Sequence, residues 1–351
     1  MKIKTDVQPF SEQEINWERL GDFLQRELPH LDTTQMEVKQ YTAGYSNLTY
    51  LLRFPNQDLI MRRPPFGKIP PKSHDMKREY RVLQLLEHPF PYAPAPYTYE
   101  EDKTIMNRHF YVMEKKEGAV LDDQIPEEIS AFSDYGTRAS HAMIDALISL
   151  HAIDIDKHSL TELGRPKGYM ERQVLGWIKR YHQSVETPHQ KIETLTSWFT
   201  EQIPEHPEST VVHNDMKLNN MMLDPNNPEK VTAVFDWELC TVGDPLSDLA
   251  SSIAYWKEPG EGYTGLSSVT DNGAFLSRLE LIHRYAYQTG RDVSNMTYYL
   301  SFAFFKISVI LQQIYLRWKQ GEIEDERFAS LDSGIQNLIN LSFRTKNNEI
   351  I

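Results

Sequence analysis

The feature that most constrains this chain is a strand-like island inside a second half that otherwise has helical periodicity. Three short apolar runs form the island: Val211-Val212, Met221 to Leu223, and Val231 to Phe235. The turn-rich sequence DPNNPEK joins the last two runs and predicts a β-hairpin. A hairpin brings its two ends side by side. Polar residues just before the hairpin, ending at Asn220, are therefore expected close to Asp236, which follows it.

The polar segment of the island has the spacing H-x-D-x-x-x-x-N, with His213, Asp215 and Asn220 at the fixed positions. This is the spacing of a kinase catalytic loop. Phosphoryl transfer explains the residue types. A carboxylate such as Asp215 can orient an alcohol and take its proton. Oxygen ligands such as Asn220 and Asp236 suit Mg²⁺. The alternative is that Asp215 and Asn220 only cap turns. The surrounding strand, hairpin and terminal Asp favour the catalytic interpretation.

The first third offers candidate phosphate-binding residues. Gly44-Tyr45-Ser46-Asn47 precedes a strand-like run, where backbone N–H groups of a loop can cover phosphates; an ordinary hairpin turn is the alternative. The next run ends in Arg62, whose guanidinium can bind two phosphate oxygens. Glu79 lies on the following helical segment and can pair with Arg62. The alternative for this pair is a surface ion pair of little consequence.

Periodicity predicts two regions, and therefore an α+β chain. In the first, apolar spacing predicts helices behind the Ser11-x-x-Glu14 capping box and over Asp75 to Glu87, and a small antiparallel sheet. Its strands are expected at Thr49 to Phe54, Asp58 to Arg62 and His109 to Glu114, and Pro89, Pro91, Pro94 and Pro96 predict a loop. Helices dominate after Gly118. We therefore expect a nucleotide-binding region over 1–115 and a catalytic, mostly helical region over 116–351.

Composition narrows the class of protein. The 351 residues carry a formal net charge of −13, which argues against a nucleic-acid partner. Met61 to Arg81 and Thr161 to Lys191 are nevertheless basic runs, which are either solvated faces or phosphate-binding surfaces. The single cysteine, Cys240, favours a reducing cytoplasm, and the N-terminus lacks the apolar region of a signal peptide. The apolar segment Tyr298 to Leu316 contains Lys306, which favours a buried core helix over a membrane span.

Five residues in or near the island have further candidate roles. Asp248, near the start of a predicted helix, either complements the helix dipole or braces the catalytic loop. His213 is expected to be a scaffold residue rather than a base, because Asp215 already occupies that position. Cys240 is expected to be a small buried side chain and Trp237 to pack beside the site. For Glu238, metal and substrate contacts both remain open.

With these residues in hand, the chain resembles the aminoglycoside phosphotransferase and choline kinase family. Within it, the resemblance is greatest to the phosphotransferase domain fused to acyl-CoA dehydrogenases. HNDMKLNN followed by FDWE carries the resemblance, supported by AGYSNLTYLLR, LIMRRPP, KREYRVLQLL, FYVMEKKEG, LHAIDID, GRPKGYMERQVLGWIKRY and GDPLSDLA. It departs at Asn214, where the family often has glycine. Asp-Trp-Glu also stands where protein kinases have Asp-Phe-Gly.

The resemblance implies a bilobal protein-kinase-like fold that binds ATP and Mg²⁺, with catalytic Asp215, metal ligands Asn220 and Asp236, and phosphate-binding Arg62. It also implies nucleotide contacts near Met113 to Lys115, which include Glu114 and Lys115. The expected acceptor is a small molecule with a hydroxyl group. It is either a hydroxyacyl-CoA-like metabolite or a cationic aminoglycoside or choline-like amine. An inactive nucleotide-binding module and a protein kinase are the rival interpretations. The first is disfavoured by the complete set of Asp215, Asn220 and Asp236, and the second by the missing multi-glycine loop.

Overall fold

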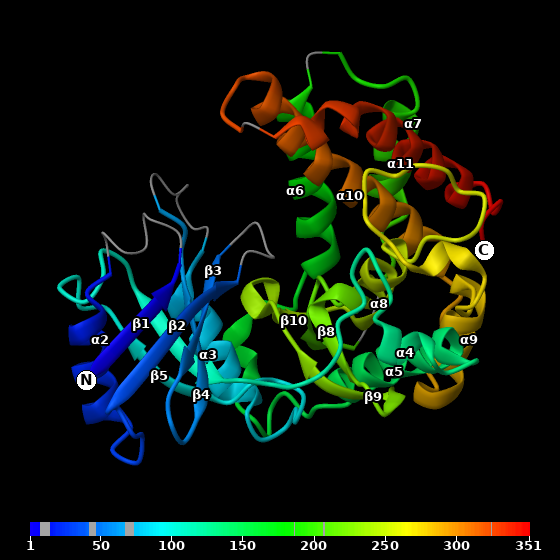
Figure 1. Cartoon of the computed structure of the whole chain (residues 1–351). Coiled ribbons are helices and arrows are strands. Elements are labelled where there is room, and N and C mark those ends of the chain that lie inside the picture. Colours follow the sequence, from blue (N-terminus) through cyan, green and yellow to red (C-terminus); the bar gives the residue numbers. More distant parts are fainter. Residues whose placement is uncertain (8–14, 42–46, 67–73, 186, 206–207, 324) are drawn as a thin grey trace. The chain divides into compact units, whose positions relative to one another are not determined.

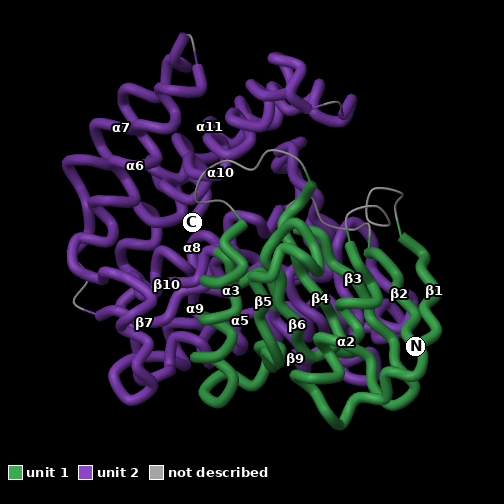
Figure 2. The backbone as a smooth tube through the Cα atoms, turned by 90° about the vertical axis from the view of Figure 1, so that its left-hand side faces the viewer, with its two compact units in different colours: residues 1–117, 235–238 green, residues 118–234, 239–351 purple. Residues whose placement is uncertain are grey.

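A computed structural model describes the chain except for residues 8–14, 42–46, 67–73, 186, 206–207 and 324. The described chain divides into two compact units, distinguished by colour in Figure 2. Unit 1 comprises residues 1–117 together with Phe235–Glu238, and unit 2 comprises residues 118–234 and 239–351. The four-residue segment that contains Asp236 therefore belongs to the N-terminal unit, although the sequence predicts a single division after residue 115.

Unit 1 is built on a six-stranded sheet in the order β1-β2-β3-β4-β6-β5 (Figure 1). Its elements are β1 (Lys2–Asp6), α2 (Trp17–Glu27), β2 (Gln35–Tyr41), β3 (Leu48–Arg53), β4 (Asp58–Arg63), α3 (Met76–Leu86), β5 (Pro96–Glu100) and β6 (Phe110–Glu114). The three strands and the two helices expected from the sequence are present. Helix α2 begins at Trp17 and is capped by Asn16, whose side chain accepts from Arg19 N at 3.0 Å. The expected capping box at Ser11 lies outside the described residues.

The sheet differs from the expectation in three respects. Strands β1 and β2 were not expected from the sequence, and they pair in parallel, so the sheet is mixed rather than purely antiparallel. Strand β2 alternates buried and exposed residues, but one buried position is Gln40, which weakens its apolar pattern. The prediction that the proline-rich segment is all loop is wrong at its end. Pro96 is the first residue of β5, a position where a strand tolerates proline.

Strand alternation assigns the two faces of the sheet. Leu59 and Met61 of β4 join the apolar cluster built around α2, where Trp17 packs edge-on against Tyr50. Arg62, the residue after Met61, lies on the opposite face with its pair partner Tyr111 of β6, since successive side chains point to opposite faces. Helix α3 contacts β5 and β6. The period of two therefore places the Arg62 guanidinium on the side of the sheet that α3 covers.

Unit 2 is largely helical, with two small two-stranded sheets. Its helices are α4 (Glu127–Ser130), α5 (Tyr135–His151), α6 (Tyr169–Ser184), α7 (Ile192–Glu201), α8 (Pro245–Ala254), α9 (Arg278–Thr289), α10 (Met296–Lys319) and α11 (Leu331–Lys346). Its strands are β7 (Thr210–Val212), β8 (Met221–Asp224), β9 (Asn227–Val234) and β10 (Thr241–Gly243). The expected hairpin is β8–β9, and it is antiparallel.

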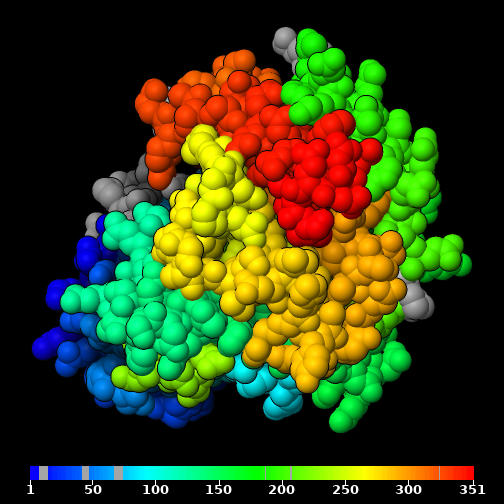
Figure 3. Space-filling view, turned by 90° about the vertical axis from the view of Figure 1, so that its right-hand side faces the viewer, coloured from blue at the N-terminus to red at the C-terminus, as the bar shows by residue number. Residues whose placement is uncertain are grey.

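Helix α10 is the central helix of unit 2 and contacts α6, α8 and α11 (Figure 1). It is long and apolar enough to cross a membrane by length and composition, but 61% of its most apolar window is buried within the protein. The prediction of a core helix is confirmed. Figure 3 shows the C-terminal residues packed beside the segment near residue 260, where Asn337 donates to the backbone carbonyls of Glu261 and Tyr263.

Candidate active site

The catalytic-loop candidates lie together in unit 2, directly after β7. A single 3-10 turn over Leu218–Asn220 folds the chain back, so that Asn220 faces Asp215. The Asn220 side-chain amide donates to the Asp215 backbone carbonyl and to its carboxylate, both at 2.9 Å. The alternative that both residues merely cap separate turns does not describe this arrangement. The two side chains are in contact.

Lys217 and Tyr255 also surround the Asp215 carboxylate, and both were missed as site residues in the sequence. Lys217 Nζ lies 3.0 Å from Asp215 Oδ2 and 4.6 Å from the centre of the Tyr255 ring. Burial raises the pKa of Tyr255 well above its usual range, and the neighbouring Asp215 charge adds to that effect. The Asp215 side chain is 15% exposed, so its carboxylate remains accessible to solvent.

Asp248 fixes the backbone at the start of the candidate catalytic loop. Its carboxylate accepts from the backbone N–H groups of His213 and Asn214, both at 2.6 Å, and pairs with His151 Nε2 at 3.1 Å. Burial alone would raise the pKa of Asp248. The hydrogen bonds and positive potential from His151 and His213 outweigh burial and hold the pKa below its usual range. Of the two roles considered for Asp248, the geometry favours the brace.

His213 has the scaffold position expected from the sequence. It is fully buried, and its Nδ1 accepts from Asp215 N at 3.3 Å. His151 lies in the LHAIDID segment that supports the resemblance, but the sequence did not predict it as a site residue. It links Asp248 to Tyr285, whose hydroxyl lies 2.7 Å from His151 Nδ1. A histidine at the end of an apolar helical stripe was the available signal.

The backbone conformation at position 214 explains how asparagine can stand where the family often has glycine. Its φ is +67°, in the left-handed region that glycine adopts freely and that asparagine tolerates. The Asn214 side chain accepts from the Tyr169 hydroxyl at 2.8 Å and donates to Leu239 O at 3.1 Å. A Cβ at Gly243 would lie 2.7 Å from the Tyr169 ring, so the glycine leaves room for that ring. Asn214 therefore keeps the required backbone conformation and gains side-chain bonds.

The candidate phosphate-binding residues form a buried cluster in unit 1. Arg62 is hydrogen-bonded to Glu79 of α3, and its other terminal nitrogen lies 3.5 Å from Asp236 Oδ1. The Arg62 side chain is 11% exposed and that of Glu79 is 1% exposed, so this is not a surface pair. Burial would lower the pKa of Arg62, but the charges of Glu79 and Asp236 and the Tyr111 hydroxyl raise it, which keeps the guanidinium positive.

The remaining nucleotide-site candidates, Ser46, Asn47, Glu114 and Lys115, differ in their surroundings. Ser46 lies outside the described residues, and Asn47 is buried with its Oδ1 2.8 Å from His74 Nδ1. The side chain of Glu114 accepts from Ala95 N, and its own N–H donates to Ala95 O. Lys115 pairs with Asp58 and Glu117. Both side chains are therefore engaged in contacts within unit 1.

Two other expectations concern the Asp236 segment. Trp237 is 1% exposed and packs edge-on against Phe90 at 5.4 Å, as expected for a core residue. Cys240 is buried, as expected. Asp236 has a φ of +66° and a side chain that is 29% exposed. Glu238 contributes to the negative potential at Arg62, and its choice between metal and substrate stays open.

In each unit taken by itself, the available donor atoms are of kinds that a magnesium nucleotide would require. Because the Asn220 nitrogen is engaged by Asp215, the amide oxygen is left for a hard cation, with the amide orientation assigned from that network. Asp236 receives a hydrogen bond only from Arg62 among the described residues, so a carboxylate oxygen is open to a cation as well. Arg62 Nε and Asn47 Nδ2 are buried donors without an acceptor in the described ranges. Donors of this kind suit phosphate oxygens.

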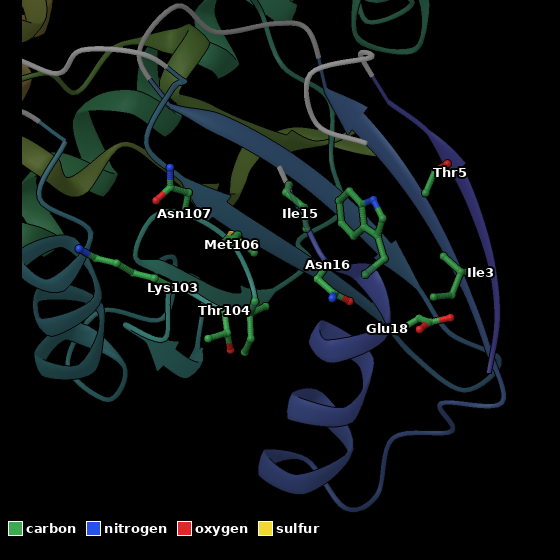
Figure 4. Close-up of a pocket in the computed structure, with 11 residues that line it drawn as sticks. Ile3, Thr5, Ile15, Asn16, Glu18, Lys103, Thr104, Met106 and Asn107 are labelled. Atoms are coloured by element: carbon green, nitrogen blue, oxygen red, sulfur yellow. The ribbon is translucent and has the colours of Figure 1, made fainter. Parts of the chain in front are cut away.

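One hollow in the described part of unit 1 lies away from these residues. Its volume is about 630 Å³, and it is lined by β1, the start of α2 and residues 103–107 (Figure 4). None of the site residues predicted from the sequence lines it. Among the described residues, no three His, Cys, Asp or Glu side chains form a metal-binding cluster.

A sheet unit with an Arg–Glu pair, followed by a helical unit with a braced H-x-D-x-x-x-x-N loop, defines a kinase-like phosphotransferase fold. The chain belongs to the phosphotransferase enzyme family, whose sequence model matches residues 37–266. It is 31% identical over 329 residues to mouse acyl-CoA dehydrogenase family member 11, covering 91% of this chain and 42% of that protein. The chain thus spans less than half the length of this relative.

Two solved structures show the same fold. A Ralstonia eutropha protein, described as a candidate aminoglycoside phosphotransferase, has a TM-score of 0.80 and 26% identity, covering 95% of this chain and 98% of that one. A spectinomycin phosphotransferase in complex with ADP and spectinomycin has a TM-score of 0.58 and 12% identity, covering 94% of this chain and 98% of that one. The expected family and fold class are confirmed.

Proposed function

We propose that this chain transfers the terminal phosphoryl group of ATP, with Mg²⁺, to a hydroxyl group of a small molecule in the cytoplasm. The observation that carries the proposal is the Asp215–Asn220 contact in a loop held by Asp248. That contact sets a carboxylate beside an amide oxygen ligand at a fixed spacing. If Asp215 and Asn220 only capped turns, the loop would not need a buried carboxylate such as Asp248 to hold it.

Each residue has a distinct part in the proposed reaction. Asp215 accepts the proton of the acceptor hydroxyl, whose oxygen forms a bond to the terminal phosphorus as the bond to the leaving ADP oxygen breaks. Asn220 and Asp236 would hold the cation, and Arg62 would neutralise phosphate charge. A magnesium ion bound there would offset charge at the phosphate oxygens. Glu79 and Tyr111 keep the Arg62 guanidinium charged and in place.

Lys217 supports the same proposal. Its ammonium, 3.0 Å from the Asp215 carboxylate, helps to keep that carboxylate oriented on the loop. Exclusion of water from the reacting groups would be needed as well, since ATP hydrolysis competes with transfer.

The acceptor that we favour is a hydroxylated metabolite of the hydroxyacyl-CoA kind. The likeness to an acyl-CoA dehydrogenase family member supports it, as does the basic run at Arg165 to Lys191. The acidic remainder of the chain favours a cationic acceptor such as an aminoglycoside or a choline-like amine instead. The spectinomycin phosphotransferase has the fold in common with this chain, and its acceptor class belongs in the same panel.

The test compares wild type with Asp215→Asn and with Asp154→Asn, an exposed turn carboxylate of unit 2, in a panel of hydroxylated metabolites scored for Mg²⁺-dependent ADP release. Asparagine keeps the shape of Asp215 and can still accept from Asn220, so it removes the base while sparing the loop. We expect kcat to fall by about 10²–10⁴-fold with nucleotide binding retained. Asp154→Asn should match wild type.

Turnover by Asp215→Asn at the wild-type rate would refute the assignment of the base. Nucleotide binding without turnover of any acceptor by wild type would instead favour an inactive nucleotide-binding module.

A further inference from the structure

One stripe of helix α6 carries a cation and an aromatic ring toward α10, which lies alongside it (Figure 1). Gln173, Trp177 and Arg180 recur at the spacing of one helix face. Gln173 accepts from Trp177 Nε1 at 3.2 Å, which fixes the indole. The Arg180 guanidinium carbon lies 4.5 Å from the centre of the Trp177 ring, and Lys306 Nζ of α10 lies 5.9 Å from it. We call Trp177, Arg180 and Lys306 the α6–α10 cluster.

Within the described ranges neither of its two cations is paired with a carboxylate, whereas several other cations of unit 2 are. Arg278, for comparison, is paired with Glu261. Across the described ranges, Lys306 donates one hydrogen bond, to the Asn214 carbonyl at 3.5 Å, and the Arg180 guanidinium packs on the Trp177 ring. The Arg180 charge acts on Lys306, and two like charges repel, so an anion close to both would be stabilised.

The cluster adjoins the catalytic loop, because the carbonyl that Lys306 contacts belongs to the residue just before Asp215. Burial lowers the pKa of Lys306, the charges of Asp215 and Asp248 oppose that effect, and Arg180 adds to it. The charges of both the Asp215 carboxylate and the Arg180 guanidinium therefore act on Lys306. A group bound here would lie beside the carboxylate that receives the acceptor hydroxyl.

We propose that the α6–α10 cluster binds an anionic group of the acceptor, a carboxylate or a phosphate ester, and so selects anionic hydroxylated acceptors over cationic ones. The inference rests on the proposed function, since it names the acceptor class of the same site. Arg180 supplies a forked guanidinium for two anion oxygens, and Lys306 supplies a point charge nearer the loop. Trp177 holds the guanidinium by a cation–π contact and excludes water on one side.

The experiment measures KM and kcat with four acceptors: hydroxybutyrate, glycerol phosphate, neutral glycerol and choline. Variants are Arg180→Gln and Lys306→Met, with Lys179→Gln as the matched control, because Lys179 is the exposed neighbour of Arg180 on α6. We expect Arg180→Gln to raise KM for the anionic acceptors at least about tenfold and to leave KM for glycerol unchanged. Lys179→Gln should behave as wild type, which separates the cluster from the overall charge of the basic run.

The two anions distinguish the source of the charge, since preference for hydroxybutyrate indicates a carboxylate and preference for glycerol phosphate a phosphate ester. The inference is overturned if wild type uses choline best, or if Arg180→Gln and Lys179→Gln change KM equally. Melting temperatures check that Lys306→Met still folds. If Lys306→Met does not fold, Arg180→Gln still tests the inference, because Arg180 is exposed.

A binding measurement keeps the inference testable if the proposed function fails. Indole fluorescence is titrated with the same four compounds in wild type, Asp215→Asn, Arg180→Gln and Trp177→Phe. A change caused only by the anions, retained in Asp215→Asn and lost in the other two variants, supports the anion site even without turnover. Absence of an anion-specific change in wild type overturns it, whatever the turnover assay shows.

Discussion

Replacing Asp248 with asparagine should destabilise unit 2 and slow the reaction together. The carboxylate accepts two backbone N–H groups at 2.6 Å and pairs with His151 at 3.1 Å. Asparagine has one acceptor oxygen, so its NH₂ group must face one of these donors. Loss of one charge-assisted bond costs about 1.5–3 kcal/mol, and a buried donor left unpaired costs about 1–3 kcal/mol. We expect a loss of about 3 kcal/mol in the free energy of unfolding, or a Tm about 6–12 °C lower for a unit of this size.

The pH dependence of this loss has a definite sign. The folded-state pKa of Asp248 is depressed, so its stabilising contribution is fully present above the pKa of the unfolded chain, about 3.9. The contribution is lost as pH falls from there through the folded-state pKa. The gap in unfolding free energy between wild type and Asp248→Asn should therefore be full at neutral pH and shrink in acid.

Urea denaturation at a series of pH values measures the gap, and Asp154→Asn is the control. Asp154 also accepts two backbone N–H groups, from Asp156 and Lys157, but it is exposed. The control should lose much less stability than Asp248→Asn. Equal unfolding free energies for wild type and Asp248→Asn at neutral pH, with unchanged kcat, would refute the brace.

Three further outcomes are expected. Arg62→Ala should raise the nucleotide KM and destabilise unit 1, because Glu79 is left buried without its partner. The double variant with Glu79→Gln should recover stability but not nucleotide affinity. Calorimetric titration and thermal melts measure the two effects, and full recovery of affinity would contradict the phosphate role of Arg62. Asn220→Ala should raise the Mg²⁺ concentration for half-maximal rate without abolishing folding, and an unchanged Mg²⁺ profile would count against a ligand role. Asn214→Val should lower the unfolding free energy by about 1–3 kcal/mol because its φ is +67°, whereas Asn214→Gly should fold normally; equal stability of the two variants would show that the left-handed conformation is not required.

Periodicity predicted the helices and strands that have a clear apolar pattern. The hairpin β8–β9, helices α2, α3 and α10, and strands β3, β4 and β6 follow from local spacing. Strand β2 was missed because Gln40 occupies one of its inward positions, and β1 because its pattern is weak. The parallel pairing of β1 with β2 depends on a contact between segments far apart in the chain, which no local pattern encodes.

The sequence by itself determined the chemistry available, because the catalytic spacing and the residue types lie within one short segment. The Asp215–Asn220 contact follows from a single turn and was predictable for that reason. Only the tertiary structure decided that Arg62 and Glu79 are buried, that Asp248 and His151 hold the loop, and that Lys306 approaches Asn214 from α10. These contacts join residues distant in the chain. Their burial and charge depend on what the other elements exclude from water, which no local sequence pattern specifies.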